Sequence, residues 1–237
     1  IVSSDKVYEH ILSNNPKNLG DIIEGQSFVI DGMKVTIISP DVDKLNQLRE
    51  KYSNHRPLCK SEIDKASVEA GSVMDDYFIP LQKFNLDYFQ EDTSVENASS
   101  IAAVFEYDDK RILWLSDSVP SVVMKSLFML GFSETNKMYC DAVLLSHHGS
   151  AANNSLALLR MIQADKYIIS ADGMNGHCLP NKETIARIVS ASSNLPVTLY
   201  FNYEDGRLIK MFKSDAQEDV KSRIDVHYLK DMEAIEF

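Results

Sequence analysis

The chain of 237 residues has few cysteines and no long apolar run. Its three cysteines, an odd number without a closely spaced pair, do not predict a disulfide framework, and a reducing compartment suits them best. No apolar stretch approaches the roughly 18 residues that a membrane span needs. Residues 1–5 contain neither a basic nor an apolar signal-peptide region. We therefore expect a cytoplasmic protein without a membrane partner.

Positive charge is also scarce, because 24 lysines and arginines face 35 acidic residues and the formal net charge is −11. Such a surface does not steer polyanions toward the protein, although a local basic groove or bound metal ions would still allow a nuclease. Hydrophobic residues make up 44% of the chain, enough to bury one substantial core. A single domain is therefore the better expectation.

Apolar strand-like segments alternate with helical patterns, which predicts an α/β layered fold. Hairpins are expected at residues 27–38, around Asp31-Gly32, and at residues 101–115, around residues 108–110. The expected helices are residues 7–12, 41–52, 61–70, 120–130, 154–163 and 181–192. The remaining apolar segments are residues 141–145, 167–170, 197–201, 207–212 and the alternating residues 224–228.

The regular pattern weakens at residues 53–96, which we interpret as an insertion or lid rather than core. The aromatic residues Tyr77, Phe78 and Tyr88 of this segment either line a substrate entrance or form a satellite core. Residues 215–237 are interpreted as a C-terminal extension with an edge strand.

Three polar motifs each follow an apolar run. Asp117 follows residues 112–115, the pair His147 and His148 follows residues 141–145, and His177 comes after residues 167–170. Strand ends are where α/β proteins build their sites, and one carboxylate with up to three imidazoles is what a divalent metal site needs. These four residues are therefore the predicted metal ligands.

Each residue also has a simpler explanation. The Asp117 carboxylate can cap the helix that follows it, and the adjacent histidines can belong to a surface loop. Successive strand residues face opposite ways, so we expect one histidine in the site and the other to orient it. His177 can be a plain loop histidine, and Cys178 can either bind zinc as a thiolate or be an ordinary buried thiol.

The order of the motifs resembles the second half of a metallo-β-lactamase-fold domain of the ComEC competence-protein type. The matching segments are Leu-Trp-Leu-Ser-Asp at residues 113–117, Ser-His-His-Gly-Ser at 146–150, Asn-Gly-His at 175–177 and the turn Asn-Ala-Ser-Ser at 97–100. The resemblance covers about residues 28–212 and implies an αββα sandwich, of which residues 1–214 supply the C-terminal part. Two departures are Ser116, where the family has glycine, and Cys178, where its last histidine is followed by proline.

The family's first metal motif, His-x-His-x-Asp-His, is absent from the sequence. The resemblance thus implies a partner, the missing N-terminal portion of the same domain, and an exposed sheet face that this portion covers. In the complete domain two divalent ions, zinc or manganese, would share a hydroxide that attacks a phosphorus or carbonyl centre. Asp117 would bridge the ions, and Asp117, His148 and His177 would be the catalytic residues. This chain alone is expected to bind metal weakly and to be incomplete or inactive.

Three functions are compatible with these observations. The first is a metal-dependent phosphodiesterase or nuclease, because the branch that the chain resembles includes a DNA-degrading domain and some of its versions look like bacterial defence components. The second is a metal-free binding or regulatory module in a larger assembly, with a protein partner or a second copy of the chain. The third is a hydrolase of a small ester, thioester or lactone. Retention of Asp117, His148 and His177 favours an enzyme.

Overall fold

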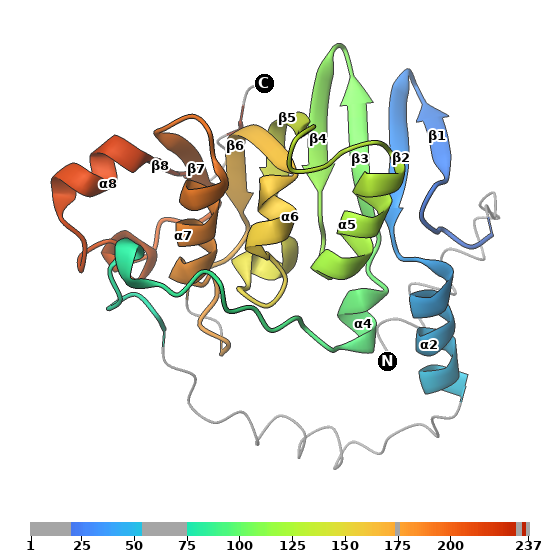
Figure 1. Ribbon diagram of the computed structural model, residues 1–237, viewed down its shortest axis with the longest axis horizontal. Coiled ribbons are helices and arrows are strands. Elements are labelled where there is room, and N and C mark those ends of the chain that lie inside the picture. Colours follow the sequence, from blue (N-terminus) through green and yellow to red (C-terminus); the bar gives the residue numbers. More distant parts are fainter. Residues whose placement is uncertain (1–19, 54–74, 174–175, 231–233, 236–237) are drawn as a thin grey trace.

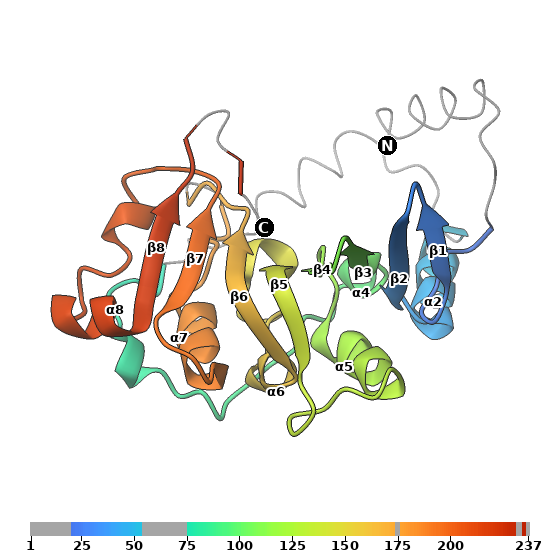
Figure 2. The same cartoon turned by 90° about the horizontal axis from the view of Figure 1, so that it is seen from above.

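The computed structural model describes residues 20–53, 75–173, 176–230 and 234–235 (Figure 1). Within these ranges the strands form one eight-stranded sheet, ordered β1 to β8 as they follow one another in the sequence. Helices α5 (Pro120–Met129), α6 (Leu156–Arg160) and α7 (Lys182–Ala191) lie along one face of this sheet (Figure 2). The fold is therefore α/β, as the sequence predicts.

The first half of the sheet is antiparallel. Strand β1 (Ser27–Ile30) pairs with β2 (Met33–Ser39), β2 with β3 (Ala102–Tyr107), and β3 with β4 (Lys110–Trp114). Both tight turns have a positive φ at their two central residues, Asp31-Gly32 and Asp108-Asp109, as a type I′ hairpin requires. The two predicted hairpins are confirmed.

The second half of the sheet is parallel, from β4 through β5 (Met138–Leu144), β6 (Ile162–Ile169) and β7 (Val197–Phe201) to β8 (Ile224–Tyr228). Helices α5, α6, α7 and α8 (Gln217–Arg223) connect these strands. Because parallel strands all end at the same edge of the sheet, the loops after β4, β5, β6 and β7 meet there. This edge carries the predicted site residues.

Two segments differ from the prediction. The helix expected at residues 154–163 ends at Arg160, and β6 begins at Ile162. The apolar spacing fits a helix and a strand equally well there, and the parallel pairing of Ile162 with Met138 makes the segment a strand. The apolar residues 207–212 contain a short 3₁₀ turn, η3 (Leu208–Lys210), whose Leu208 is fully buried.

Helix α2 (Val42–Ser53) matches its expected range closely, whereas the helices expected at residues 7–12 and 61–70 lie outside the described residues. The part of the expected lid that is described contains the 3₁₀ turn η1 (Leu81–Lys83) and α4 (Val95–Ala98). Tyr77 and Leu81 of this segment are buried in the main core, whereas Phe78 and Tyr88 are exposed. The segment therefore contributes to the core as well as to the surface.

The main core lies between the sheet and helices α5, α6 and α7. Leu113, Tyr167 and Leu199 point into it from three strands, and each is at most 1% exposed. The opposite face carries a smaller cluster centred on Val35 and Ile37, and beyond it Trp114 remains 47% exposed. Of the helices that the structure describes, none has the length and apolar character of a membrane span.

Candidate functional site

The two adjacent histidines lie in a turn directly after β5. Residues Ser146–Gly149 form a short 3₁₀ segment in which His147 and His148 both have left-handed backbone angles, with φ of 44° and 56°. The fully buried Asn154 holds this turn, because its side chain accepts a hydrogen bond from the Ser146 amide and donates to the Ser146 and Ser150 carbonyls. Both imidazole rings line the same cavity, so the alternation expected for a strand does not apply here.

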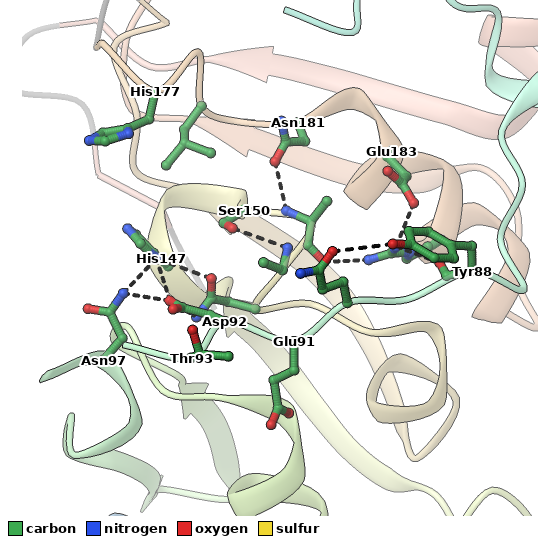
Figure 3. A pocket seen from close by; sticks show the side chains of 16 residues that line it. Tyr88, Glu91, Asp92, Thr93, Asn97, His147, Ser150, His177, Asn181 and Glu183 are labelled. Atoms are coloured by element: carbon green, nitrogen blue, oxygen red, sulfur yellow. Dashed lines mark hydrogen bonds and ion pairs between the residues drawn. The ribbon is translucent and has the colours of Figure 1, made fainter. Parts of the chain in front are cut away.

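The Nδ1 atom of His147 is surrounded by three side chains (Figure 3). It lies 3.1 Å from Asn153 Oδ1, 3.2 Å from Asn97 Nδ2 and 3.5 Å from Asp92 Oδ2. The Asn97 and Asn153 amides both donate to Asp92, so their oxygen and nitrogen positions follow from the network. Two of these neighbours, Asn153 Oδ1 and Asp92 Oδ2, are acceptors and the third, Asn97 Nδ2, is a donor, so most of the contacts favour the tautomer with the proton on Nδ1 and the lone pair on Nε2.

The Asp92 carboxylate keeps its charge in this network. Burial alone would raise its pKa, but the hydrogen bonds from Asn97, the Ser94 amide and Asn153, together with nearby His147, lower it below the ordinary value of 3.8. In other proteins a carboxylate behind a metal-binding histidine fixes the orientation of its ring.

His148 is held in the same way by a different partner. Its Nδ1 lies 2.5 Å from the carbonyl oxygen of Ser170, the residue that follows β6. A carbonyl only accepts, so Nδ1 carries the proton and Nε2 is again the free nitrogen. The two imidazole rings are 5.9 Å apart between their centres, and their planes are inclined by 62°.

The loop after β5 packs closely on the loop that leads to α7. Thr184 Oγ1 donates to the Gly149 carbonyl at 2.8 Å, and the Ala151 amide donates to Asn181 Oδ1 at 2.8 Å. Gly149 has a φ of 81°, and a Cβ atom there would lie 2.8 Å from the Cβ atom of Pro180. Glycine is therefore required, and the histidine turn is fixed relative to the loop that contains His177.

The loop that contains His177 is also contacted by the expected lid and by the loop after β7. Arg207 donates to the Gly173 carbonyl and to the Asp75 carboxylate, and it contacts Cys178 Sγ at 3.7 Å. The Tyr77 hydroxyl donates to the Pro180 carbonyl at 3.1 Å. This part of the loop is thus tied to two segments distant in the sequence.

Helix α7 begins beside this loop and is capped from a distance. The two carboxylate oxygens of Asp76 accept hydrogen bonds from the Lys182 and Glu183 amides in its first turn. Burial nevertheless outweighs these bonds and raises the pKa of Asp76. Lys182 itself is fully buried and pairs with Asp215.

Two cavities open at this edge of the sheet. The larger has a volume of about 630 Å³ and extends from His147 and His177 to Tyr88 (Figure 3), and the smaller, of about 390 Å³, also includes His148 and Tyr203. His147, His177 and Leu179 line both cavities, and we call these three residues the shared wall.

Asp117 lies in the turn after β4, next to the histidine turn. The His147 amide donates to the Ser116 carbonyl at 2.7 Å, and Asn153 Nδ2 lies 3.3 Å from the Asp117 carbonyl. Asp117 is half-buried, but it does not belong to the lining of either cavity. All three histidines therefore line the smaller cavity, and Asp117 lies in the neighbouring turn.

Backbone strain is concentrated at the same edge. Among the described residues, seven other than glycine have a positive φ, and three of these are the aspartates of the hairpin turns. The other four are Ser116, His147, His148 and Cys178, all in the loops after β4, β5 and β6. Such conformations cost about 1–3 kcal/mol each and cluster at functional sites, where the surroundings hold them in place.

A metal ion is not accommodated by the described residues alone. Within these ranges, no three side chains of histidine, cysteine, aspartate or glutamate come together in a group that could hold one. The ligand roles of Asp117, His147, His148 and His177 stay predictions.

Sequence reasoning missed Asp92 and Asn153 as partners of His147. Asn153 had a local signal, because two asparagines, at positions 153 and 154, follow the Ser-His-His-Gly-Ser motif after two alanines. Asp92 lies in an acidic segment that is typical of a solvated surface, and only its contact with a distant loop gives it a role. Asn97, expected to frame the site, does contact it.

Comparisons with known proteins add little to this geometry. No protein-family model matches the sequence, and no curated protein matches it. A solved structure with some similarity is described as "Crystal Structure of a New Diphosphatase from the PhnP Family". The two sequences are 18% identical, the match covers 57% of this chain and 39% of that protein, and the TM-score is 0.23. So low a TM-score does not establish a common fold, and the α/β architecture rests on the strands and helices described above.

Proposed function

We propose that this chain is part of a metal-dependent hydrolase of the metallo-β-lactamase superfamily, of the phosphodiesterase type. Asp117, His147, His148 and His177 would be its share of the ligands, with the remaining ligands outside the described ranges. The observation that carries the proposal is the pair His147 and His148, since each Nδ1 lies within hydrogen-bond distance of an acceptor, an arrangement that favours the tautomer with a lone pair on Nε2. Two such imidazoles at one cavity are suited to bind a cation.

Two further features support the proposal. The histidines and Asp117 follow successive parallel strands, at the sheet edge where α/β proteins place their sites. Asp92, with its lowered pKa, lies behind His147, as carboxylates do behind metal-binding histidines in other proteins.

The proposal can be tested by metal binding to the intact gene product. Isothermal titration with Zn²⁺ or Mn²⁺ should show at least about one ion per chain, as an occupied centre of this class requires. His148→Ala should abolish that binding, and Asp92→Asn should weaken it about 10–100-fold. His227→Ala is the matched control, because this exposed histidine pairs with Asp225 on β8, away from the cavities. Fewer than one ion per chain, or equal binding by the His148 variant, would contradict the proposal.

Substrate class needs a separate assay. Metal-dependent turnover of bis(4-nitrophenyl) phosphate, a thioester and a lactone by the same preparation would separate a phosphodiesterase from a small-ester hydrolase. Asp117→Ala should lose the activity, and unchanged turnover would remove Asp117 from the mechanism.

A metal-free binding module is the second candidate. It is favoured by one observation, that the described side chains include no three-residue group able to hold a metal. This function predicts no uptake of Zn²⁺ or Mn²⁺ by the intact protein, which is the reverse of the result expected above.

A further inference from the structure

Two of the histidines, His147 and His177, line two neighbouring cavities. His147, His177 and Leu179, the shared wall, belong to the lining of both the larger and the smaller cavity. In Figure 3 the larger cavity has His147 and His177 at one end and Tyr88 at the opposite end. A group bound at the shared wall can therefore extend in two directions.

Each cavity includes one exposed tyrosine. Tyr88 is 64% exposed in the larger cavity, and Tyr203, from the loop after β7, is 51% exposed in the smaller one. The backbone at Tyr88 is fixed, because Arg187 donates to its carbonyl at 3.3 Å, and its hydroxyl donates to Gln90. Exposed aromatic rings of this kind offer a flat surface on which a planar group can stack.

The charges of the cavities limit what can bind. Arg187 is the single arginine or lysine among the described residues that line either cavity. It is only 2% exposed, and its guanidinium donates to the carbonyls of Ala151, Asn154 and Tyr88. It also pairs with Glu183. No cation of the described lining is therefore left to bind additional phosphates along either cavity.

From these observations we propose that the substrate is a single phosphodiester with two aromatic arms, such as a dinucleoside monophosphate, rather than a long polynucleotide. One arm stacks on Tyr88 in the larger cavity and the other on Tyr203 in the smaller. The phosphodiester lies at the shared wall, beside His147 and His177. This inference rests on the proposed phosphodiesterase function, because it takes the histidines as the reaction centre.

Binding measurements test the inference without requiring turnover. The probes are a dinucleoside monophosphate (adenylyl-adenosine), AMP, inorganic phosphate and a 20-nucleotide oligo(dA), each titrated calorimetrically into the intact protein. Adenylyl-adenosine should bind more tightly than AMP or phosphate, and at least as tightly as oligo(dA). Tyr88→Ala and Tyr203→Ala should each weaken its binding about 5–150-fold, the loss expected for one stacked base.

Matched variants separate stacking from a general effect on the fold. Tyr88→Phe and Tyr203→Phe should bind like the parent protein, because the ring is retained. Tyr107→Ala removes a tyrosine of similar exposure, 59%, that lines neither of the two cavities, and it should change nothing. Equal binding by both alanine variants, no binding of adenylyl-adenosine, or a clear preference for oligo(dA) would overturn the inference.

The failure of this inference can be told apart from that of the proposed function. Tight binding of adenylyl-adenosine without metal-dependent hydrolysis would reject the enzyme and keep the two-armed site. Hydrolysis of bis(4-nitrophenyl) phosphate with the same KM in the parent and both alanine variants would keep the enzyme and reject the site.

Discussion

Replacement of Asn154 by alanine is expected to destabilise the protein, through the histidine turn, more than replacement of an exposed asparagine by alanine does. The Asn154 side chain is fully buried, accepts one hydrogen bond from the Ser146 amide and donates two, at 2.8 Å each, to the Ser146 and Ser150 carbonyls. Alanine removes all three bonds, and it leaves backbone groups of two buried serines without these partners.

The magnitude follows from the cost of unsatisfied buried groups. Each lost bond costs about 1 kcal/mol or more, so the free energy of unfolding should fall by about 3 kcal/mol. In a chain of this size 1 kcal/mol lowers the Tm by about 2–4 °C, which gives a decrease of about 6–12 °C.

Thermal unfolding followed by circular dichroism gives the Tm directly. Urea unfolding followed by the fluorescence of Trp114, the single tryptophan, gives the free energy. Asn136→Ala is the matched control, because this exposed asparagine makes its one side-chain bond to a carbonyl, that of Gly131, at 2.8 Å. A Tm for the Asn154 variant within about 2 °C of this control would refute the account of the turn.

Three further substitutions test other parts of the structure. The pKa of Asp92 is lowered in the fold, so its stabilisation is present above the ordinary pKa of 3.8 and is lost as the pH falls through the lowered value. Asp92→Asn should therefore make the free energy of unfolding, measured in urea, depend less on pH in the acid range. Gly149→Ala should cost about 1–3 kcal/mol in a thermal melt, because the residue has a φ of 81° and no room for a Cβ atom. Lys182→Met should lower the urea stability by about 3–5 kcal/mol, because it leaves the buried carboxylate of Asp215 without its ion partner.

Each of these substitutions has its own control. Asp87→Asn changes an exposed carboxylate of the same segment and should keep the parent's dependence on pH. Gly206→Ala meets no atom within 4 Å and should be nearly neutral, so an equal loss in both glycine variants would contradict the packing argument. Adding Asp215→Asn to the Lys182 variant should recover part of the stability, and no recovery would show that the buried charge is not the cause.

Much of the fold could be predicted from local signals. The turns Asp31-Gly32 and Asp108-Asp109 define both hairpins, because a type I′ turn depends on residues that tolerate a positive φ. Pro120 at the first turn of α5 marks the start of that helix. The positions of His147, His148 and His177 after strands were also predictable, and once those strands are parallel the residues must lie at one edge.

Other features depended on contacts between distant segments. The apolar spacing at residues 154–163 is compatible with a helix and a strand, and pairing with β5 decides where α6 ends. Tyr77 and Leu81 belong to the core because they pack against α7 and its loop, which their own segment does not reveal.

The sequence by itself thus determined the hairpin turns, most of the strands and the residue types at the strand ends, because these depend on neighbours along the chain. Only the tertiary structure decided the partners of Nδ1 in both histidines and the two cavities. The physical reason is that Asp92, Asn153 and the Ser170 carbonyl come from separate segments, and each holds an imidazole only once the sheet and its loops have packed.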